Sequence, residues 1–178
     1  IRCCVDKAGQ EDMLAWLYDE DRWPSGSCGG RVTKDHPEYA LKCLLFTRKP
    51  YGPEEGRELT QSVPCMGRCD FRSGNGQLLA VYDVELDENG RLRAYRKLPD
   101  GETPRGNVWY AYMEHGSADP WFNDSAYVDT LQPEAMRRFL DLTYEVYDRH
   151  FRDQFGKRIP AIFTDEPQMI WNRKERLH

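Results

Sequence analysis

The sequence predicts an α/β fold built on a parallel sheet whose strands open into acidic loops. Apolar runs at residues 13–18 and 159–164 end in the acid clusters 19–21 and 165–166. An amphipathic helix is predicted over residues 133–155, between these two runs, as a strand–helix–strand unit requires. Carboxyl ends of parallel strands carry the chemistry of many α/β enzymes. We therefore expect one carboxylate-rich, catalytic edge.

The composition limits the classes of partner that the chain is expected to bind. The 178 residues carry a net charge of −5 and 39% hydrophobic side chains. The acidic balance, without a basic block, argues against nucleic acid and anionic membranes as partners. No apolar stretch approaches the roughly 20 residues of a membrane helix. The chain opens without methionine, so we expect it to begin inside a longer polypeptide.

The cysteines are interpreted as reduced thiols, which predicts a cytoplasmic location. A chain of this length and core content needs no disulfide framework. No two CxxC pairs occur, and no histidine stands at a ligand-like spacing from a cysteine, so no metal site is predicted. Disulfides and zinc stay open as alternatives. The six residues concerned are Cys3, Cys4, Cys28, Cys43, Cys65 and Cys69.

In the first third of the chain, the sequence predicts short helices and strands joined by loops with defined turns. Residues 1–9 have the pattern of a helix end closed by Gly9, and strand 13–18 follows. Loop 22–30 is rich in glycine and proline and sets Trp23 beside acidic residues.

A β-rich insertion is predicted at about residues 40–100. It comprises a strand at 40–47, a loop over 48–77 and a hairpin over 78–98 whose turn is supplied by residues 87–90.

The second half of the chain predicts a third main strand and the best helix. Strand 108–113 is counted with the parallel layer and ends in Glu114 and His115. Helix 133–155 begins at Pro133 and ends before Gly156. Its expected buried face consists of Met136, Phe139, Leu140, Thr143, Val146, Tyr147, His150 and Phe151.

Carboxylates flanked by aromatic residues are typical of glycoside hydrolysis. One carboxylic acid protonates the leaving oxygen, while another carboxylate acts as nucleophile or as base for water. Glu166 is the candidate acid, kept protonated by apolar and acidic surroundings, with Asp165 as its catalytic neighbour. Acidic, amide and aromatic side chains would bind the sugar. These are Asp19, Glu20, Asp21, Trp23, His115, Trp121, Asn123, Tyr127 and Asp129.

Three stretches together resemble large TIM-barrel glycoside hydrolases, closest to the α-L-rhamnosidase-like group around glycoside hydrolase family 106. They are residues 18–26 with Gly29 and Gly30, residues 121–129, and residues 163–167. The resemblance spans roughly residues 10–170.

The resemblance implies a partial (β/α)8 barrel, about its first half, with Glu166 as the acid at the end of the fourth strand. Asp165 stands where many such barrels have asparagine. A second catalytic carboxylate would come from a later strand, and the remainder of the barrel from the parent chain or another subunit.

Two other functions are weighed against this one. The chain could be a non-catalytic carbohydrate-binding remnant that uses the same aromatic and acidic edge. A divalent-metal hydrolase would instead use Asp19, Asp21, Asp165 and Glu166 as hard oxygen ligands. No cofactor is predicted, although a calcium ion assisting sugar binding is compatible with the first function.

Overall fold

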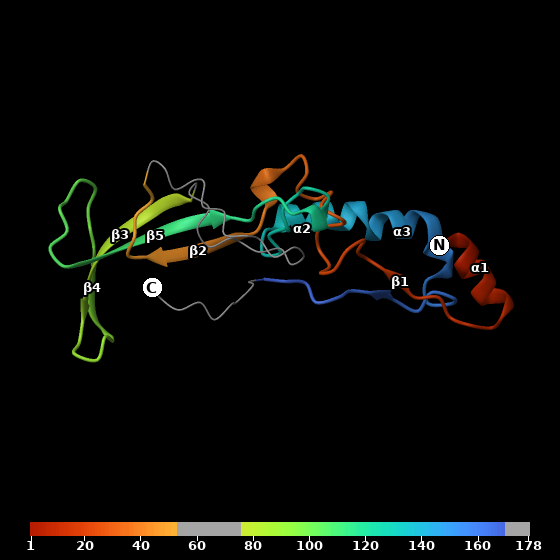
Figure 1. Cartoon of the computed structure of the whole chain (residues 1–178). Helices are drawn as coiled ribbons and strands as arrows, with labels where there is room; N and C mark the ends of the chain where they lie inside the picture. Colours follow the sequence, from red (N-terminus) through yellow and green to blue (C-terminus); the bar gives the residue numbers. More distant parts are fainter. Residues whose placement is uncertain (53–75, 170–178) are drawn as a thin grey trace. The chain divides into compact units, whose positions relative to one another are not determined.

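A computed structural model describes residues 1–52 and 76–169, which form two compact units of a mixed α/β fold (Figure 1). The helical unit comprises residues 1–41 and 118–169. The sheet unit comprises residues 42–52 and 76–117. Cys65, Cys69 and most of the loop predicted at 48–77 lie outside the described residues.

The helical unit contains a two-stranded parallel sheet, as expected for a strand–helix–strand unit. Strand β1 (Leu17–Tyr18) pairs with β6 (Ile162–Phe163), with Leu17 opposite Ile162. Both strands are shorter than the runs predicted at 13–18 and 159–164. No barrel is formed by the described residues, so the partial barrel stays a prediction.

The predicted helices are present, with one interruption. Helix α1 spans Arg2–Gln10 and runs one residue past Gly9. The single helix predicted over 133–155 is divided into α2 (Pro133–Leu142) and α3 (Tyr144–Phe151). The break lies at Thr143, whose hydroxyl donates to the Phe139 carbonyl (2.7 Å). Such back-bonding by a β-branched hydroxyl residue bends helices.

The core of the helical unit lies between the helices and one face of the β1–β6 pair. Its buried centre is Val5, Leu17, Phe151 and Ile159, with Ala15, Tyr147, Phe155 and Ile162 packed around it. The predicted buried helix face is confirmed at Phe139, Thr143 and Phe151. It is wrong at Leu140 and His150, which are exposed.

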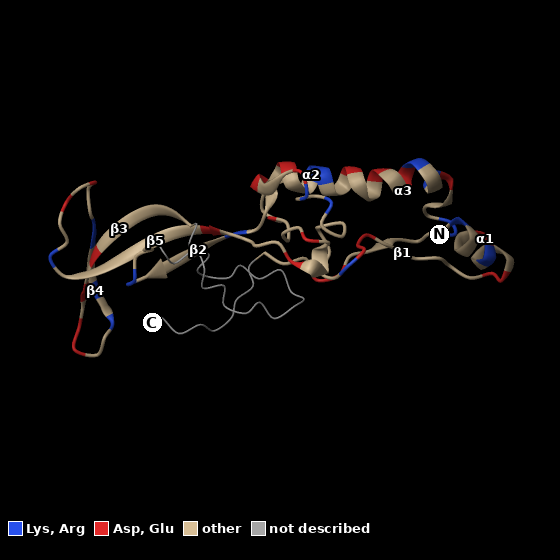
Figure 2. Cartoon of the chain, turned by 45° about the horizontal axis from the view of Figure 1, so that its top comes forward, with Lys and Arg blue, Asp and Glu red and all other residues tan. Residues whose placement is uncertain are grey.

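Acidic and basic residues are interspersed along α2 and α3 (Figure 2). Arg137 bridges Asp141 and Glu145 across the break, and Arg152 pairs with Asp148. Exposed pairs of this kind stabilise a helix only slightly. Among the helices that the structure describes, none combines the length and apolar character needed to cross a bilayer.

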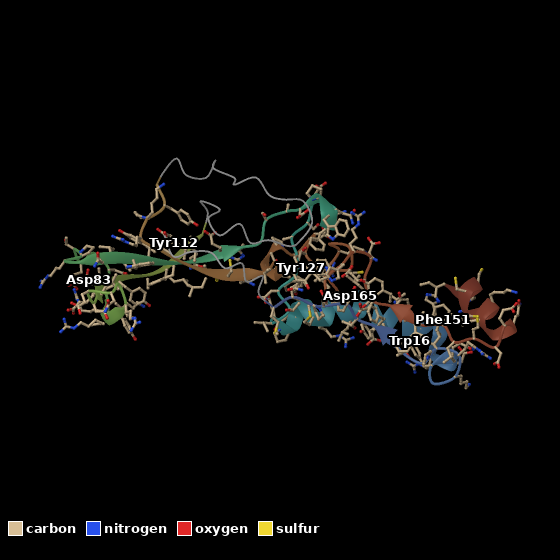
Figure 3. All side chains as sticks on the ribbon, turned by 60° about the horizontal axis from the view of Figure 1, so that its bottom comes forward. Trp16, Asp83, Tyr112, Tyr127, Phe151 and Asp165 are labelled. Carbon is tan, nitrogen blue, oxygen red and sulfur yellow. The ribbon has the colours of Figure 1, made fainter. Side chains whose placement is uncertain are left out.

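The second face of the β1–β6 pair is left bare by the described residues. Leu14, Trp16 and Phe163 are 57%, 62% and 50% exposed. Side chains alternate along a strand, so Leu17 points into the core while Trp16 points outward (Figure 3). Parallel sheets are normally covered on both faces.

The sheet unit is a four-stranded antiparallel sheet in the order β2–β5–β3–β4. Its strands are β2 (Lys42–Thr47), β3 (Gln77–Leu86), β4 (Leu92–Lys97) and β5 (Asn107–His115). The hairpin predicted over 78–98 is confirmed as β3 and β4.

The assignment of the strand at 108–113 to the parallel layer is wrong. Strand β5 lies between β2 and β3 and is antiparallel to both. Strand β5 is flanked by strands at both edges, and its apolar run has the same pattern as a strand of a parallel sheet. His115 therefore lies opposite Lys42, at the start of β2, and Glu114 and His115 do not end a strand of the parallel pair.

Two segments of the helical unit, residues 39–41 and 127–129, are tied to each other by backbone hydrogen bonds. The Leu41 N–H donates to the Tyr127 carbonyl (2.8 Å), and the Asp129 N–H donates to the Tyr39 carbonyl (2.8 Å). An isolated bridge between Ala40 and the residue opposite it, Val128, lies between these bonds. The sheet unit begins at residue 42, directly after the first of these segments, and the chain returns to the helical unit at residue 118.

Ile159 offers a test of the helical core. It is fully buried, so Ile159→Ala removes apolar contacts and leaves a cavity, and we expect a loss of about 2–5 kcal/mol in the free energy of unfolding. Leu131→Ala, at a position that is 66% exposed, is the matched control. Urea midpoints of the two variants measure the difference, and equal midpoints would contradict this core.

Candidate functional site

A hydrogen-bonded cluster around Asp19 lies at the carboxyl end of the parallel pair. The Asp19 carboxylate is 2% exposed and accepts three hydrogen bonds from hydroxyl groups. Oδ1 accepts from Ser25 (2.7 Å), and Oδ2 accepts from Tyr144 (2.8 Å) and Thr164 (2.6 Å). Asp19 therefore joins β1 to the following loop, to α3 and to the residue after β6.

The neighbouring Glu20 carboxylate organises the loop that follows it. Glu20 is 8% exposed, and its two oxygens accept backbone N–H groups from around the loop. The donors to Oε2 are Gly26 (3.0 Å), Ser27 (2.9 Å) and Cys28 (2.8 Å), and those to Oε1 are Asp21 (2.7 Å), Arg22 (3.3 Å) and Gly29 (2.6 Å). Converging N–H groups form an anion nest that compensates the buried charge.

Two glycines allow the loop to close around Glu20. Gly29 and Gly30 have φ values of +60° and +86°, which side-chain-bearing residues rarely adopt. A Cβ on Gly29 would lie 2.5 Å from an Asp21 carboxylate oxygen, and one on Gly30 would lie 2.0 Å from the Phe122 carbonyl oxygen. The loop thus depends on glycine at both positions.

Ser25 fixes the backbone that leads to the predicted catalytic residues. The Ser25 N–H donates to the Asp165 carbonyl (2.9 Å), and the Asp165 N–H donates to the Ser25 hydroxyl (2.9 Å). Glu166 follows in the left-handed region, at φ +43°, which is uncommon for a residue other than glycine. The backbone of Asp165–Glu166 is therefore held against the Glu20 loop.

Tyr127 supports the same segment from inside the unit (Figure 3). Its ring is 1% exposed. Its hydroxyl donates to the Ser25 carbonyl (2.7 Å) and accepts from the Gln168 N–H (3.0 Å). Burial raises the pKa of Tyr127 well above its ordinary value. Tyr127, which we predicted to bind sugar, here supports the backbone.

Trp121 presents an indole ring beside the Glu20 loop. The ring is 37% exposed, and its Nε1–H donates to the Trp23 carbonyl (2.6 Å). The Arg22 guanidinium lies 5.8 Å from the ring centroid, within cation–π range. Asn123 donates its amide N–H to the Gly29 carbonyl (2.7 Å). These contacts fasten the 119–125 segment to the Glu20 loop.

The predicted site residues thus fall into different settings. Asp19, Glu20 and Tyr127 are buried in the framework. Asp21 and Glu166 are exposed, and Asp165 is half-buried. Among the described residues, the carboxylates of Asp165 and Glu166 accept no hydrogen bond and form no ion pair.

Glu166 lacks the apolar surroundings predicted for a general acid, because its side chain is exposed in the described structure. Asp129 accepts from the Leu131 N–H (3.0 Å) in the turn before α2. His115 is exposed at the end of β5, in the sheet unit.

Sequence reasoning missed the hydroxyl donors of the cluster. Tyr144 and Thr164 each donate to Asp19, and Tyr147 donates to the Tyr18 carbonyl (2.6 Å). Tyr144 and Tyr147 are one helical turn apart and share a face of α3. That spacing is the signal that would have placed both hydroxyl groups toward the strand ends.

Within residues 1–52 and 76–169, no three His, Cys, Asp or Glu side chains are grouped as a metal ion would need. That no cofactor is needed, with calcium compatible with sugar binding, stays a prediction. Cys3, Cys4 and Cys28 are free thiols in the structure, and burial raises the pKa of Cys28.

No family model, curated protein or solved structure matches this chain significantly.

The Glu20 nest predicts a large effect of an isosteric substitution. Glu20→Gln removes the charge and turns an NH2 group toward backbone N–H donors, leaving several of them unsatisfied. We expect a loss of about 3 kcal/mol in the free energy of unfolding and faster proteolysis within residues 21–29. Glu134→Gln, on the exposed first turn of α2, is the control. A Glu20→Gln protein with the control's stability would contradict the nest.

Tyr127 predicts an alkaline loss of stability. The unfolded chain releases this proton near the ordinary pKa of 10.0, whereas the raised pKa of buried Tyr127 keeps it bound in the folded chain. The resulting stabilisation is complete below pH 10 and is lost as the pH rises toward the folded pKa. As the pH rises from below to above 10, the urea midpoint should fall less steeply in Tyr127→Phe than in the wild type. Tyr95→Phe, whose ring is exposed, should show the same dependence on pH as the wild type. An unchanged slope in Tyr127→Phe would refute this.

Proposed function

We propose that this chain is part of the catalytic domain of a glycoside hydrolase, with Glu166 as the general acid. One observation carries the proposal. Asp165 and Glu166 follow β6 after Thr164, at the carboxyl end of a parallel strand pair, on a backbone held by Ser25. Their carboxylates are free of protein partners among the described residues. Reactive groups of α/β enzymes occupy this position.

The proposed chemistry is proton transfer to a glycosidic oxygen. The Glu166 carboxylic acid donates its proton to the leaving oxygen as the bond to the anomeric carbon breaks. A second carboxylate attacks that carbon or deprotonates a water molecule. Asp165 is the neighbouring candidate, and a later strand is the alternative source. Sugar bound over the exposed Glu166 would exclude water from the carboxyl group.

Asp19 and Glu20 act as positioning residues in this proposal. Their oxygens accept hydrogen bonds from the loop, α3 and β6, so they hold the strand ends and do not contact sugar. The sugar-binding role then passes to exposed groups near them. Asp21 and Asn123 supply polar groups, and the 37% exposed Trp121 ring supplies a stacking surface.

The bare face of the β1–β6 pair supports the proposal of a larger sheet. Trp16 and Phe163 would pack against further strands, supplied by the parent chain or by another subunit. Strands β1 and β6 are direct neighbours, so Glu166 follows the second strand of this pair. The resemblance had implied the fourth strand of a barrel.

A non-catalytic carbohydrate-binding role is the second candidate. Two observations favour it. Asp19 and Glu20 are buried as hydrogen-bond acceptors of the framework, whereas the Trp121 ring keeps an exposed surface. A divalent-metal hydrolase has less support, because both Asp19 oxygens are occupied by hydroxyl donors.

Glu166→Gln in the full-length parent protein tests the proposal. With aryl glycosides of poor leaving groups we expect about 10²–10⁴-fold slower hydrolysis, because protonation of the leaving oxygen is lost. Dinitrophenyl glycosides, which need little protonation, should lose much less activity. Glu134→Gln is the matched control. Wild-type rates in Glu166→Gln would rule out this acid, and sugar binding without turnover in the wild-type protein would favour the binding role.

A further inference from the structure

Tyr18, the last residue of β1, lies on the same face of the strand pair as Asp165. Asp19 and Thr164 point toward α3, because both form hydrogen bonds with the Tyr144 hydroxyl (2.8 and 2.9 Å). Side chains alternate in direction along a strand. Tyr18 and Asp165 are the neighbours of these two residues in the chain and therefore point to the face away from α3.

The position of the Tyr18 ring is fixed by its neighbours. Tyr18 is paired with Phe163 in the register of the two strands, and their ring centroids lie 5.7 Å apart. The Tyr18 carbonyl accepts a hydrogen bond from the Tyr147 hydroxyl (2.6 Å), which holds the backbone against α3. Ring and backbone are both held, so the phenol hydroxyl has a defined place near the strand ends.

The Tyr18 phenol lies in the electrostatic field of the carboxylates at this edge. Burial raises its pKa above the ordinary value, and the negative charges of Asp165, Glu20 and Asp19 add to this effect, while the Ser25 side chain opposes it. Among the three charges, that of Asp165 contributes most. The phenol therefore stays protonated at neutral pH, and its O–H group can act as a donor.

The hydrogen bonds of these carboxylates decide which of them the phenol can serve. The Glu20 oxygens are surrounded by the backbone N–H groups of their own loop. The Asp19 oxygens accept hydroxyl groups on the side of α3. The Asp165 backbone is held by Ser25, but its carboxylate accepts no hydrogen bond from the described residues. The Asp165 carboxylate is therefore the one that can still accept the phenol hydroxyl.

We propose that Tyr18 is a positioning residue whose hydroxyl group holds the Asp165 carboxylate in place during the proposed reaction. Contacts between catalytic groups often become shorter when substrate binds, so a hydrogen bond between the two need not be formed beforehand. Asp165 is then the second carboxylate of the reaction, in place of one from a later strand, while Glu166 supplies the proton. This inference rests on the proposed glycoside hydrolysis and names a further residue for it.

Titration of the Tyr18 phenol in the full chain tests the pairing without any substrate. We expect Asp165→Asn to lower the pKa of the phenol, because the negative charge that raises it is removed. Glu166→Gln neutralises the adjacent carboxylate and is the matched control, which should lower the pKa less. Ring NMR measures the pKa, with the Tyr18 signal assigned from its absence in Tyr18→Phe. A phenol with the wild-type pKa in Asp165→Asn would overturn the pairing.

Hydrolysis by the full-length parent protein tests the positioning role. Tyr18→Phe keeps the ring and should lower kcat about tenfold with little change in KM, as expected when a hydrogen bond to a charged group is lost. The loss should be the same for aryl glycosides with good and poor leaving groups, whereas the loss in Glu166→Gln should depend on the leaving group. Tyr95→Phe, at an exposed ring of the sheet unit, is the control.

The two experiments separate this inference from the proposed function. A wild-type kcat in Tyr18→Phe would overturn the positioning role, even if Glu166→Gln is inactive. A parent protein that hydrolyses no glycoside would overturn the proposed function, and the titration would still decide whether Tyr18 and Asp165 are paired.

Discussion

The capture of backbone N–H groups by the buried Glu20 carboxylate is the interaction on which the acidic edge of the helical unit depends. Removing a carboxylate from water is costly unless hydrogen bonds replace its hydration, and here the loop itself supplies them. The loop must curl to do so, and the curl delivers Ser25 to both Asp19 and Asp165. The conformation of the loop therefore determines how the groups at the strand ends are held.

The acids at the two strand ends are consequently of two kinds. Asp19 and Glu20 point inward and act as hydrogen-bond acceptors for the framework. Glu166, beyond the other strand, is exposed, and its carboxylate has no protein partner among the described residues. A cluster of carboxylates in a sequence thus does not imply that each one contacts a ligand. Burial and the identity of the hydrogen-bond donors decide between a positioning role and a chemical one.

Local patterns were predictable from the sequence, and long-range choices were not. Helix α1 and the β3–β4 hairpin depend on neighbouring residues, and both were predicted. The direction of β5 depends on which strands flank it, and an apolar run carries no such information. The Glu20 nest was missed for a related reason. A carboxylate becomes a loop organiser only when glycines such as Gly29 adopt positive φ values, a conformation that composition does not reveal.

The tie between residues 39–41 and 127–129 has an evolutionary consequence. The hydrogen bonds of this tie, like those of Trp121 and Asn123 to the Glu20 loop, are made within the helical unit, and no residue of the sheet unit takes part in them. The sheet unit is then a part of the chain that can be replaced as a whole during evolution. Selection can lengthen it, reshape it or replace it altogether, while Asp19, Glu20 and the strand ends keep their geometry.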